Sequence, residues 1–236
     1  MENLKALTEA VCCVAREAGH FLKEERKSFR REVVQEKHAH DYVSYVDKAS
    51  EKKVVSALRK LLPEAGFIAE EGSAAYSDET YCWVVDPLDG TTNYIHDNAP
   101  YCVSIALRDK QSLLLGVVYE PCRDECFYAW KGGGAYVNGE RLRVSLVSEP
   151  KDAFVVTELP YNFEQYARTG EHLIHELYGK VAGIRMNGSA ALALCYVAAG
   201  RFDAWLEAFI GKWDFSAAAL MVLEAGGKGT DFLGNE

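Results

Sequence analysis

An apolar run that ends in two closely spaced acids constrains this chain more than any other feature. Residues 83–92 read WVVDPLDGTT, so Asp86 and Asp89 close an apolar strand and a small-residue turn follows. Carboxylates held close at the end of a buried strand are costly unless a cation neutralises them. Mg²⁺ prefers such oxygen ligands, and the N–H groups that open a following helix can hold an anion. The segment therefore predicts a divalent-metal site beside a phosphate site.

A structural alternative exists for this segment, because Asp, Pro and Gly are also common in polar turns. The D-x-x-D spacing differs from the alternating acids of a calcium-binding loop. It also differs from the D-x-D-x-T pattern of phosphatases that form an aspartyl-phosphate. Attack by water on a metal-bound phosphate therefore fits the spacing better than a covalent intermediate does.

The charge and hydropathy of the chain limit its partners and its location. The 236 residues carry a net charge of −9, whereas nucleic acid as a main partner requires clustered Lys and Arg. Charged residues interrupt residues 1–17, and no apolar run is long enough to cross a bilayer, so we expect neither a signal peptide nor a membrane partner. The seven cysteines, mostly in apolar segments, fit small buried thiols in a reducing cytoplasm.

The first half of the chain has two helical patterns followed by strand patterns. Apolar residues at three- and four-residue spacing predict an amphipathic helix over 3–25, and a second helix opens at Asp47 and stops at Pro63. Strands are predicted at 66–69, 81–85, 103–107, 113–119, 125–130, 135–137 and 142–144. The Asn138-Gly139 pair is typical of a hairpin, so residues 1–147 are expected to form an α+β half with an antiparallel sheet.

The second half, residues 148–236, alternates strands and helices. Strands at 154–157, 183–186 and 202–206 are separated or followed by helices at 162–179, 188–199 and 214–225. This alternation predicts an α/β arrangement that packs on the first half as one compact unit. The last residues read as the start of a further strand, so we expect that a C-terminal piece is missing.

Four further acids could join Asp86 and Asp89, although each has a structural explanation. Glu70 and Glu71 follow the apolar residues 67–69, which repeats the strand-then-acid pattern, but surface glutamates after strands are common. Asp47 and Asp214 each stand at the start of a predicted helix, where capping is a sufficient reason for an acid. A capping acid can also hold a catalytic hydroxyl rigidly.

The chain resembles the inositol monophosphatase family over essentially its whole length. Five segments carry the resemblance, in the family's order: 47–51 (DKASE), 70–71 (EE), 86–93 (DPLDGTTN), 188–190 (GSA), and 213–218 with 224–227 (WDFSAA and EAGG). The resemblance implies the layered α-β-α-β-α sandwich of the inositol monophosphatase and fructose-1,6-bisphosphatase type. It also implies about two to three Mg²⁺ ions in each site.

The resemblance also implies a ligand set for these metals. Glu70, Asp86 and the Leu88 carbonyl would hold the first metal. Asp86, Asp89 and Asp214 would hold the second, and Glu70 with waters would hold a weakly bound third. Paired metals acidify the attacking water and stabilise both the attacking and the leaving oxygens.

Catalytic and substrate-binding residues follow from the same resemblance. Thr91, hydrogen-bonded to Asp47, would orient the nucleophilic water, and Glu70 is the third implied catalytic residue. The Gly90 and Thr91 amides would bind phosphate. The residues implied to contact the substrate are Asp89, Gly90, Thr91, Gly188, Ser189, Ala190, Glu207 and Asp214. A carboxylate at Glu207 can accept hydrogen bonds from neighbouring hydroxyl groups of a polyol.

The expected function is Mg²⁺-dependent hydrolysis of a phosphate monoester, with myo-inositol monophosphate as the favoured substrate. The alternatives are another substrate (a sugar phosphate, 3'-phosphoadenosine 5'-phosphate or NADP) and a non-catalytic relative that binds metal or inositol phosphate. The family further implies a lithium-sensitive, cytoplasmic homodimer. Two departures stand out: Ser44 replaces the family's usual threonine, and family members usually continue beyond the point where this chain ends.

Overall fold

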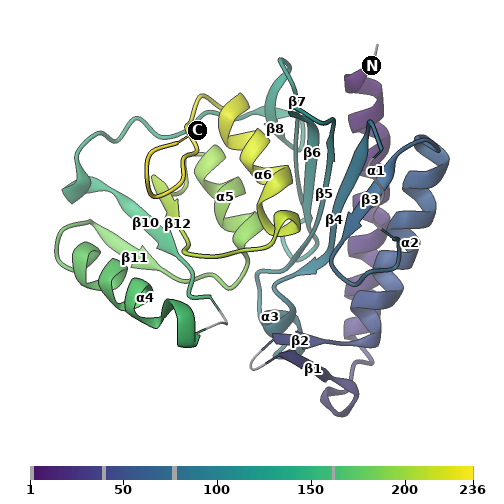
Figure 1. The fold of residues 1–236 in the computed structure, drawn as a ribbon, viewed down its shortest axis with the longest axis horizontal. Helices are drawn as coiled ribbons and strands as arrows, with labels where there is room; N and C mark the ends of the chain where they lie inside the picture. Colours follow the sequence, from purple (N-terminus) through teal and green to yellow (C-terminus); the bar gives the residue numbers. More distant parts are fainter. Residues whose placement is uncertain (1–2, 39–40, 76–78, 161–162, 236) are drawn as a thin grey trace.

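Five alternating layers of helix and sheet make up the molecule (Figure 1). The computed structural model describes residues 3–38, 41–75, 79–160 and 163–235. Helices α1 and α2 cover one face of a seven-stranded sheet, and α5 and α6 cover the other face. A three-stranded sheet and then α4 lie beyond α5 (Figure 1). The predicted layered α-β-α-β-α fold is confirmed.

The first two helices form the outer layer on the N-terminal side. Helix α1 (Leu4–Arg26) follows the predicted pattern and buries the stripe that includes Val11, Ala15 and Leu22. Helix α2 spans Tyr45–Leu61, so the prediction that it opens at Asp47 was wrong by two residues. Ser44 is the N-cap of α2, and Asp47 lies in its first turn as the acid of a capping box.

Seven strands form the larger sheet, in the order β3-β4-β5-β6-β7-β8-β9. The strands are β3 (Gly66–Ala69), β4 (Cys82–Asp89), β5 (Cys102–Arg108), β6 (Leu113–Glu120), β7 (Glu125–Trp130), β8 (Gly134–Val137) and β9 (Glu140–Arg141). All neighbours pair antiparallel except β3 and β4, which are parallel. Strands β5 and β6 are buried on both faces because helices cover each side.

Several elements of the structure differ from those that the sequence predicts. The predicted strand at 142–144 was wrong: pairing ends at Arg141, and Val144 instead donates its N–H to the carbonyl of Ala225 at the end of α6. The short 3-10 helix η1 (Arg31–Val33) and the hairpin of β1 (Gln35–His38) and β2 (Asp41–Val43) were not predicted, because this charged segment has no clear apolar period. Cys13 lies in an apolar segment of the sequence, where a buried thiol was expected, but its side chain is exposed on α1.

The C-terminal half contains the smaller sheet. Its elements are the 3-10 helix η2 (Pro150–Asp152), β10 (Phe154–Thr157), α4 (Phe163–Leu177), β11 (Gly183–Arg185), α5 (Ala190–Ala198), β12 (Ala204–Leu206) and α6 (Lys212–Glu224). The strands are parallel in the order β11-β10-β12. Helix α4 was predicted at 162–179; residue 162 lies outside the described residues, and the helix ends at Leu177.

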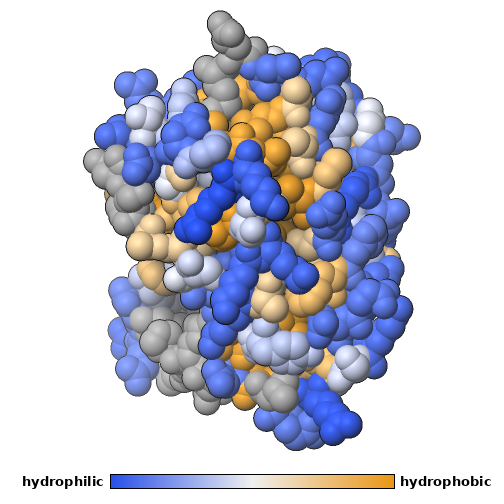
Figure 2. Space-filling view, turned by 90° about the vertical axis from the view of Figure 1, so that its right-hand side faces the viewer, coloured by the Kyte–Doolittle hydropathy of each residue, from blue (hydrophilic) through white to orange (hydrophobic). Residues whose placement is uncertain are grey.

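Two apolar clusters fill the faces of the larger sheet. One lies under α1 and α2 and the other under α5 and α6. Ala217 and Ala218 of α6 are fully buried, and Gly116 of β6 lies directly against the Ala217 backbone, so small residues allow the close approach that the sequence suggests. Figure 2 shows the outer face over α1 and α2, where apolar surface remains visible between polar side chains. In the described part of the chain, no helix has the length and hydropathy to cross a membrane.

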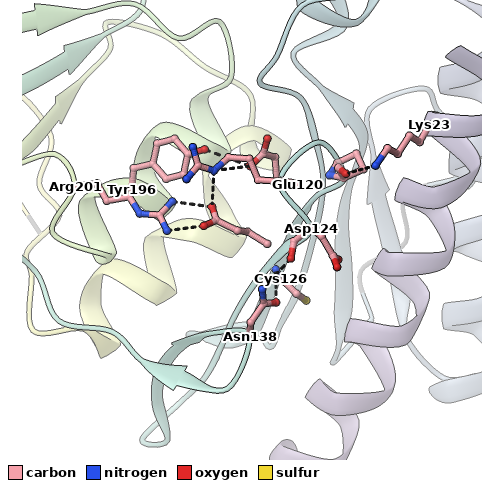
Figure 3. Close-up of polar contacts among 10 residues, drawn as sticks. Lys23, Glu120, Asp124, Cys126, Asn138, Tyr196 and Arg201 are labelled. Atoms are coloured by element: carbon pink, nitrogen blue, oxygen red, sulfur yellow. Dashed lines mark hydrogen bonds and ion pairs between the residues drawn. The ribbon is translucent and has the colours of Figure 1, made fainter.

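A polar network joins α1, the β6–β7 turn and the end of α5 (Figure 3). Arg201 pairs with Glu125 through two contacts of 2.6 and 2.7 Å. Beside this pair, the Tyr196 hydroxyl contacts the fully buried side chain of Glu120 at 3.4 Å. Lys23 donates to the Pro121 carbonyl at 3.2 Å. These contacts hold the β6–β7 turn, which lies at the same end of the large sheet as Asp89.

Candidate active site

Strand β4 delivers both acids of the metal motif. In a regular strand, residues three apart point to opposite faces of the sheet. Here the pairing of β4 with β5 shifts between Asp86 and Asp89, and the Leu88 N–H donates to Asp86 Oδ1 at 2.9 Å instead of continuing the ladder. This irregularity turns both carboxylates toward the same space.

Three carboxylates meet at the end of this strand. One oxygen each of Asp86, Asp89 and Asp214 lies within 4.8 Å of the others, and we call these three residues the acidic cluster. Asp86 and Asp89 are buried, and Asp214 is half-buried. Asp214 comes from the first turn of α6, where its Oδ2 accepts the Gly211 N–H at 2.7 Å. Asp214 therefore caps α6, as its position in the sequence predicts, and it also belongs to the acidic cluster.

Burial dominates the electrostatics of the cluster. Burial raises the pKa of Asp86 well above its usual range, and the charges of Glu70, Asp89 and Asp214 raise it further. Burial also raises the pKa of Asp89, although hydrogen bonds from Ser189 and from the backbone of α5 act in the opposite direction. Converging hard oxygen ligands that are costly to ionise without a counter-charge fit a divalent cation.

Glu70 reaches the cluster because β3 runs parallel to β4. Ala69 pairs with Val85, and the Glu70 N–H donates to the Val85 carbonyl at 3.2 Å, so Glu70 follows β3 at the level of Asp86. The buried Glu51 of α2 holds the next residues, since its carboxylate accepts the N–H groups of Glu71 and Ser73 at 2.7 Å each.

The role of Glu51 is not predicted by the sequence. The available signal was its position four residues after Asp47, on the side of α2 that also carries Val54 and Leu58. A charged residue on an otherwise buried helix face needs a partner, and the partners here are backbone N–H groups.

Thr91 and Asp47 are in contact, as the family resemblance implies. The Thr91 hydroxyl lies 3.1 Å from Asp47 Oδ1 and 2.9 Å from the Leu88 carbonyl. A hydroxyl donates a single proton, so these two contacts are alternatives. Asp47 is 1% exposed; burial raises its pKa, whereas hydrogen bonds from Ser44 and Thr91 lower it.

Gly90 makes the turn between the acids and the short helix α3 (Thr91–Ile95), which the sequence predicted. Its φ of 90° lies in the left-handed region that favours glycine. A Cβ at this position would lie 2.9 Å from the Pro100 carbonyl oxygen and 3.1 Å from that of Gly188. The turn therefore needs glycine both for its conformation and for its space.

Asp89 links the two halves of the chain. Its Oδ2 accepts the Ser189 hydroxyl at 2.6 Å and the Ala191 N–H at 2.9 Å. Ser189 is the N-cap of α5, which begins at Ala190. The predicted residues 188–190 thus lie against the metal motif, and the Oδ1 of Asp89 is the oxygen that these contacts leave for a ligand.

Two residues that the sequence analysis did not select hold residues 187 and 188. Glu158 Oε1 accepts the N–H groups of Asn187 and Gly188 at 2.6 and 2.9 Å. The Asn93 amide donates to the Asn187 and Pro100 carbonyls at 2.8 Å each. Asn93 could have been suspected of a role, because it lies in the motif segment 86–93. No feature of the sequence around Glu158 indicates a role at the site.

Glu207 faces the same space from the residue after β12. Its Oε2 is buried, with no hydrogen-bond partner among the described residues. Burial raises the Glu207 pKa to about 9, and the charges of Glu158, Asp214 and Asp89 add to the shift. An orphaned, buried carboxylate oxygen beside the acidic cluster is an acceptor that a ligand's hydroxyl group can satisfy.

Several known proteins resemble this chain in sequence and in fold. The model of the inositol monophosphatase family matches residues 3–236. Nus factor SuhB of Pseudomonas aeruginosa is 46% identical over 86% of this chain and 76% of its own length. Inositol-1-monophosphatase of Rhizobium meliloti is 41% identical over 81% of this chain and 72% of its own. The crystal structure of the extragenic suppressor protein suhB from Bartonella henselae superposes with a TM-score of 0.91 at 37% identity, covering 98% of this chain and 89% of that one.

The layered fold and the buried acidic cluster define the class of protein as a phosphatase of the metal-dependent type. The chain belongs to the inositol monophosphatase family.

Proposed function

We propose that this protein hydrolyses the phosphate monoester of a polyol with Mg²⁺, and that myo-inositol monophosphate is the favoured substrate. The observation that carries the proposal is the acidic cluster beside the Thr91–Asp47 contact. The cluster, Glu70 and the Leu88 carbonyl are the groups that would hold the metal ions. Bound Mg²⁺ would supply charge neutralisation for the phosphate and a more acidic attacking water.

The protein's own residues have separable tasks in this proposal. When the Thr91 hydroxyl donates its hydrogen bond to Asp47, its oxygen lone pairs are free to accept a hydrogen bond from a water and so to orient that water. The same rotation releases the Leu88 carbonyl from its contact with Thr91. The Gly90 and Thr91 amides are the proposed phosphate donors at the start of α3.

The alcohol is proposed to lie between residues 188–190, Glu207 and Asp214. Glu207 supports a hydroxyl-rich alcohol because it offers an unpartnered acceptor oxygen within the described structure. A site built with acceptors for substrate hydroxyls discriminates against alcohols that lack them.

A substrate panel tests this proposal. Release of inorganic phosphate is measured with Mg²⁺ from myo-inositol 1-phosphate, a sugar phosphate, 3'-phosphoadenosine 5'-phosphate and NADP. A tenfold higher kcat/KM on any of the other three would refute the inositol assignment. Absence of phosphate release from all four substrates would favour a non-catalytic protein that binds metal or inositol phosphate. This alternative is retained because some relatives of the chain are named Nus factor SuhB.

A matched pair of variants tests the role of Thr91. Thr91→Ser keeps the hydroxyl and Thr91→Val removes it at nearly constant volume. We expect Thr91→Val to lower kcat by about 100-fold or more, and Thr91→Ser to remain within about tenfold of the wild type. Equal activity of the two variants would contradict the proposed orientation of the water.

The remaining family expectations are also proposals for this chain. We propose a homodimer, inhibition by lithium, and action in the cytoplasm with no nucleic-acid or membrane partner. Sedimentation of the purified protein tests the first of these. A lithium titration of phosphate release tests the second, and cell fractionation tests the third.

A further inference from the structure

Two of the cysteines meet between α1 and the large sheet. Cys12 is half-buried on α1, where it packs against the apolar cluster that contains the buried Cys126 of β7. The two side chains share a hydrogen bond, so their sulfur atoms are neighbours across the interface of helix and sheet. Neither residue takes part in the proposed phosphatase function.

Arg16 holds α1 in place over Cys126. It lies one turn after Cys12, and its guanidinium donates to Asp124 Oδ1 at 2.8 Å and to Asn138 Oδ1 at 2.9 Å. Asn138 in turn exchanges two hydrogen bonds with the Cys126 backbone, each of 3.0 Å (Figure 3). The contact between the two thiols therefore belongs to a fixed arrangement of α1 on β7, and it keeps the sulfur atoms within reach of each other.

Hydrogen bonding and charge make this pair more acidic than an ordinary thiol. The hydrogen bond with Cys12 lowers the pKa of Cys126, and the positive charge of Arg16 lowers it further, although burial acts in the opposite direction. The same hydrogen bond raises the pKa of Cys12. The pair therefore loses one proton readily and shares the other, so the negative charge can pass to Cys12, which is the sulfur nearer to solvent. A thiolate is the form that reacts with oxidants.

We propose that Cys12 and Cys126 are an oxidant-reactive thiol pair, activated by Arg16, that closes reversibly to a disulfide between α1 and β7. The oxidant is a peroxide. The Cys12 thiolate attacks one oxygen of hydrogen peroxide, the O–O bond breaks, and a sulfenic acid and a hydroxide ion form. The Cys126 thiol then attacks the sulfenic sulfur, and the sulfenic oxygen leaves with the thiol proton as water. The hydroxide takes up the proton that Cys12 released.

The net reaction converts two thiols and one hydrogen peroxide into a disulfide and two waters, so the two sulfur atoms supply the two electrons. A dithiol reductant reverses the reaction by thiol–disulfide exchange. Transient disulfides of this kind fit the reducing cytoplasm proposed for this protein. The bond joins residues far apart in the sequence and closes a loop of roughly 110 residues, so it restricts the unfolded chain strongly.

Two neighbouring thiols of α1 provide a matched comparison. Cys13 is exposed and lies in the same tryptic peptide as Cys12, whereas Cys126 lies in another. Cys13→Ser therefore leaves Cys12 alone in its peptide, and Cys12→Ser leaves Cys13 alone. Both reduced proteins are treated with hydrogen peroxide, free thiols are blocked with an alkylating reagent, and the peptides are analysed by mass spectrometry without reduction. Circular dichroism follows thermal unfolding of each protein before and after dithiothreitol.

In Cys13→Ser we expect a peptide linked through Cys12 and Cys126. The Cys12 thiol should be lost at least about tenfold faster than the Cys13 thiol of Cys12→Ser. The oxidised form of Cys13→Ser should have a Tm about 5–15 °C above that of the reduced form, and dithiothreitol should remove both the link and the gain. Cys12→Ser should show neither.

A second pair of variants tests the activation by Arg16. Arg16→Gln, made together with Cys13→Ser, should slow formation of the link by about tenfold at pH 7. Lys5→Gln removes an exposed charge from the same helix and should leave the rate unchanged. Equal rates in these two variants would overturn the assignment of Arg16 as the activating cation.

The main comparison can refute the thiol pair itself. Loss of the Cys12 and Cys13 thiols at equal rates would do so, and so would oxidation of Cys12 to a sulfinic acid without a linked peptide. The comparison replaces only residues of α1 that are exposed or half-buried, so it does not depend on a variant of the buried Cys126. None of these measurements uses phosphate release, so the thiol pair and the proposed phosphatase function stand or fall separately.

Discussion

Replacing Gly90 by alanine probes the turn on which the whole metal motif depends. The Gly90 φ of 90° costs a non-glycine residue about 1–2 kcal/mol. The new Cβ would lie 2.9 Å from the Pro100 carbonyl oxygen, 3.1 Å from that of Gly188 and 3.3 Å from the Tyr101 Cα. All three neighbours are backbone atoms that cannot rotate away, and overpacking of this kind costs about 1–3 kcal/mol.

One effect acts in the opposite direction. Alanine reduces the conformational entropy of the unfolded chain, which stabilises the protein by about 0.4–1 kcal/mol. The net destabilisation of Gly90→Ala is therefore about 1–5 kcal/mol. For a chain of this length, 1 kcal/mol lowers Tm by about 2–4 °C, so we expect a fall of roughly 2–20 °C.

Gly139 offers a matched control for this substitution. Its φ is 91°, and a Cβ there would meet nothing within 4 Å. Gly139→Ala carries the same conformational and entropic contributions without the collision, so it should be more stable than Gly90→Ala by about 1–3 kcal/mol. Thermal unfolding followed by circular dichroism measures both variants. Equal Tm values would show that the backbone around Gly90 yields freely, and the argument that this turn requires glycine for its space would be wrong.

Three further predictions concern buried carboxyl groups. Glu51→Ala should lower the free energy of unfolding by about 1–3 kcal/mol in urea titrations, because it leaves two part-buried N–H groups without their acceptor, and it should reduce phosphate release by displacing Glu70. Burial raises the Glu120 pKa to about 7, so the stability linked to this group is present below the ordinary pKa and is lost as the pH rises toward 7. Glu120→Gln should therefore raise Tm at pH 8 relative to the wild type more than it does at pH 5, and equal shifts at the two values would contradict this sign. Mg²⁺ at about 100 times its Kd should raise Tm by roughly 5–11 °C, from about 2.7 kcal/mol of binding linkage, and Asp89→Asn should lose most of this gain.

The elements with a strong apolar period could be predicted from the sequence. The repeat in α1 and the strands from β4 to β8 follow directly from side chains that must be buried on one or both faces. The β1–β2 hairpin could not be found in this way, because its charged residues bury too little apolar surface to leave a pattern. The strand predicted at 142–144 does not form, because the Val144 N–H donates to the Ala225 carbonyl at the end of α6 and not to a neighbouring strand.

The residues of the candidate site also differ in how far the sequence predicts them. Asp86 and Asp89 could be found because two acids at the end of an apolar strand break the ordinary rule for burial. Asp214 needed the family resemblance, since its neighbours in sequence explain it equally well as a helix cap. Glu51 and Glu158 could not be assigned, because their partners are backbone N–H groups distant in sequence and only the folded chain brings them together.

The contribution of α6 to the acidic cluster has a consequence for the order in which the protein matures. Two of the three carboxylates are synthesised early, on β4, and the third follows much later in the sequence, on α6. A nascent chain that has folded its large sheet still lacks the complete ligand set until α6 has docked against β6. The proposed metal site is thus complete only after α6 has docked, so metal occupancy would report that the two halves of the chain have packed together.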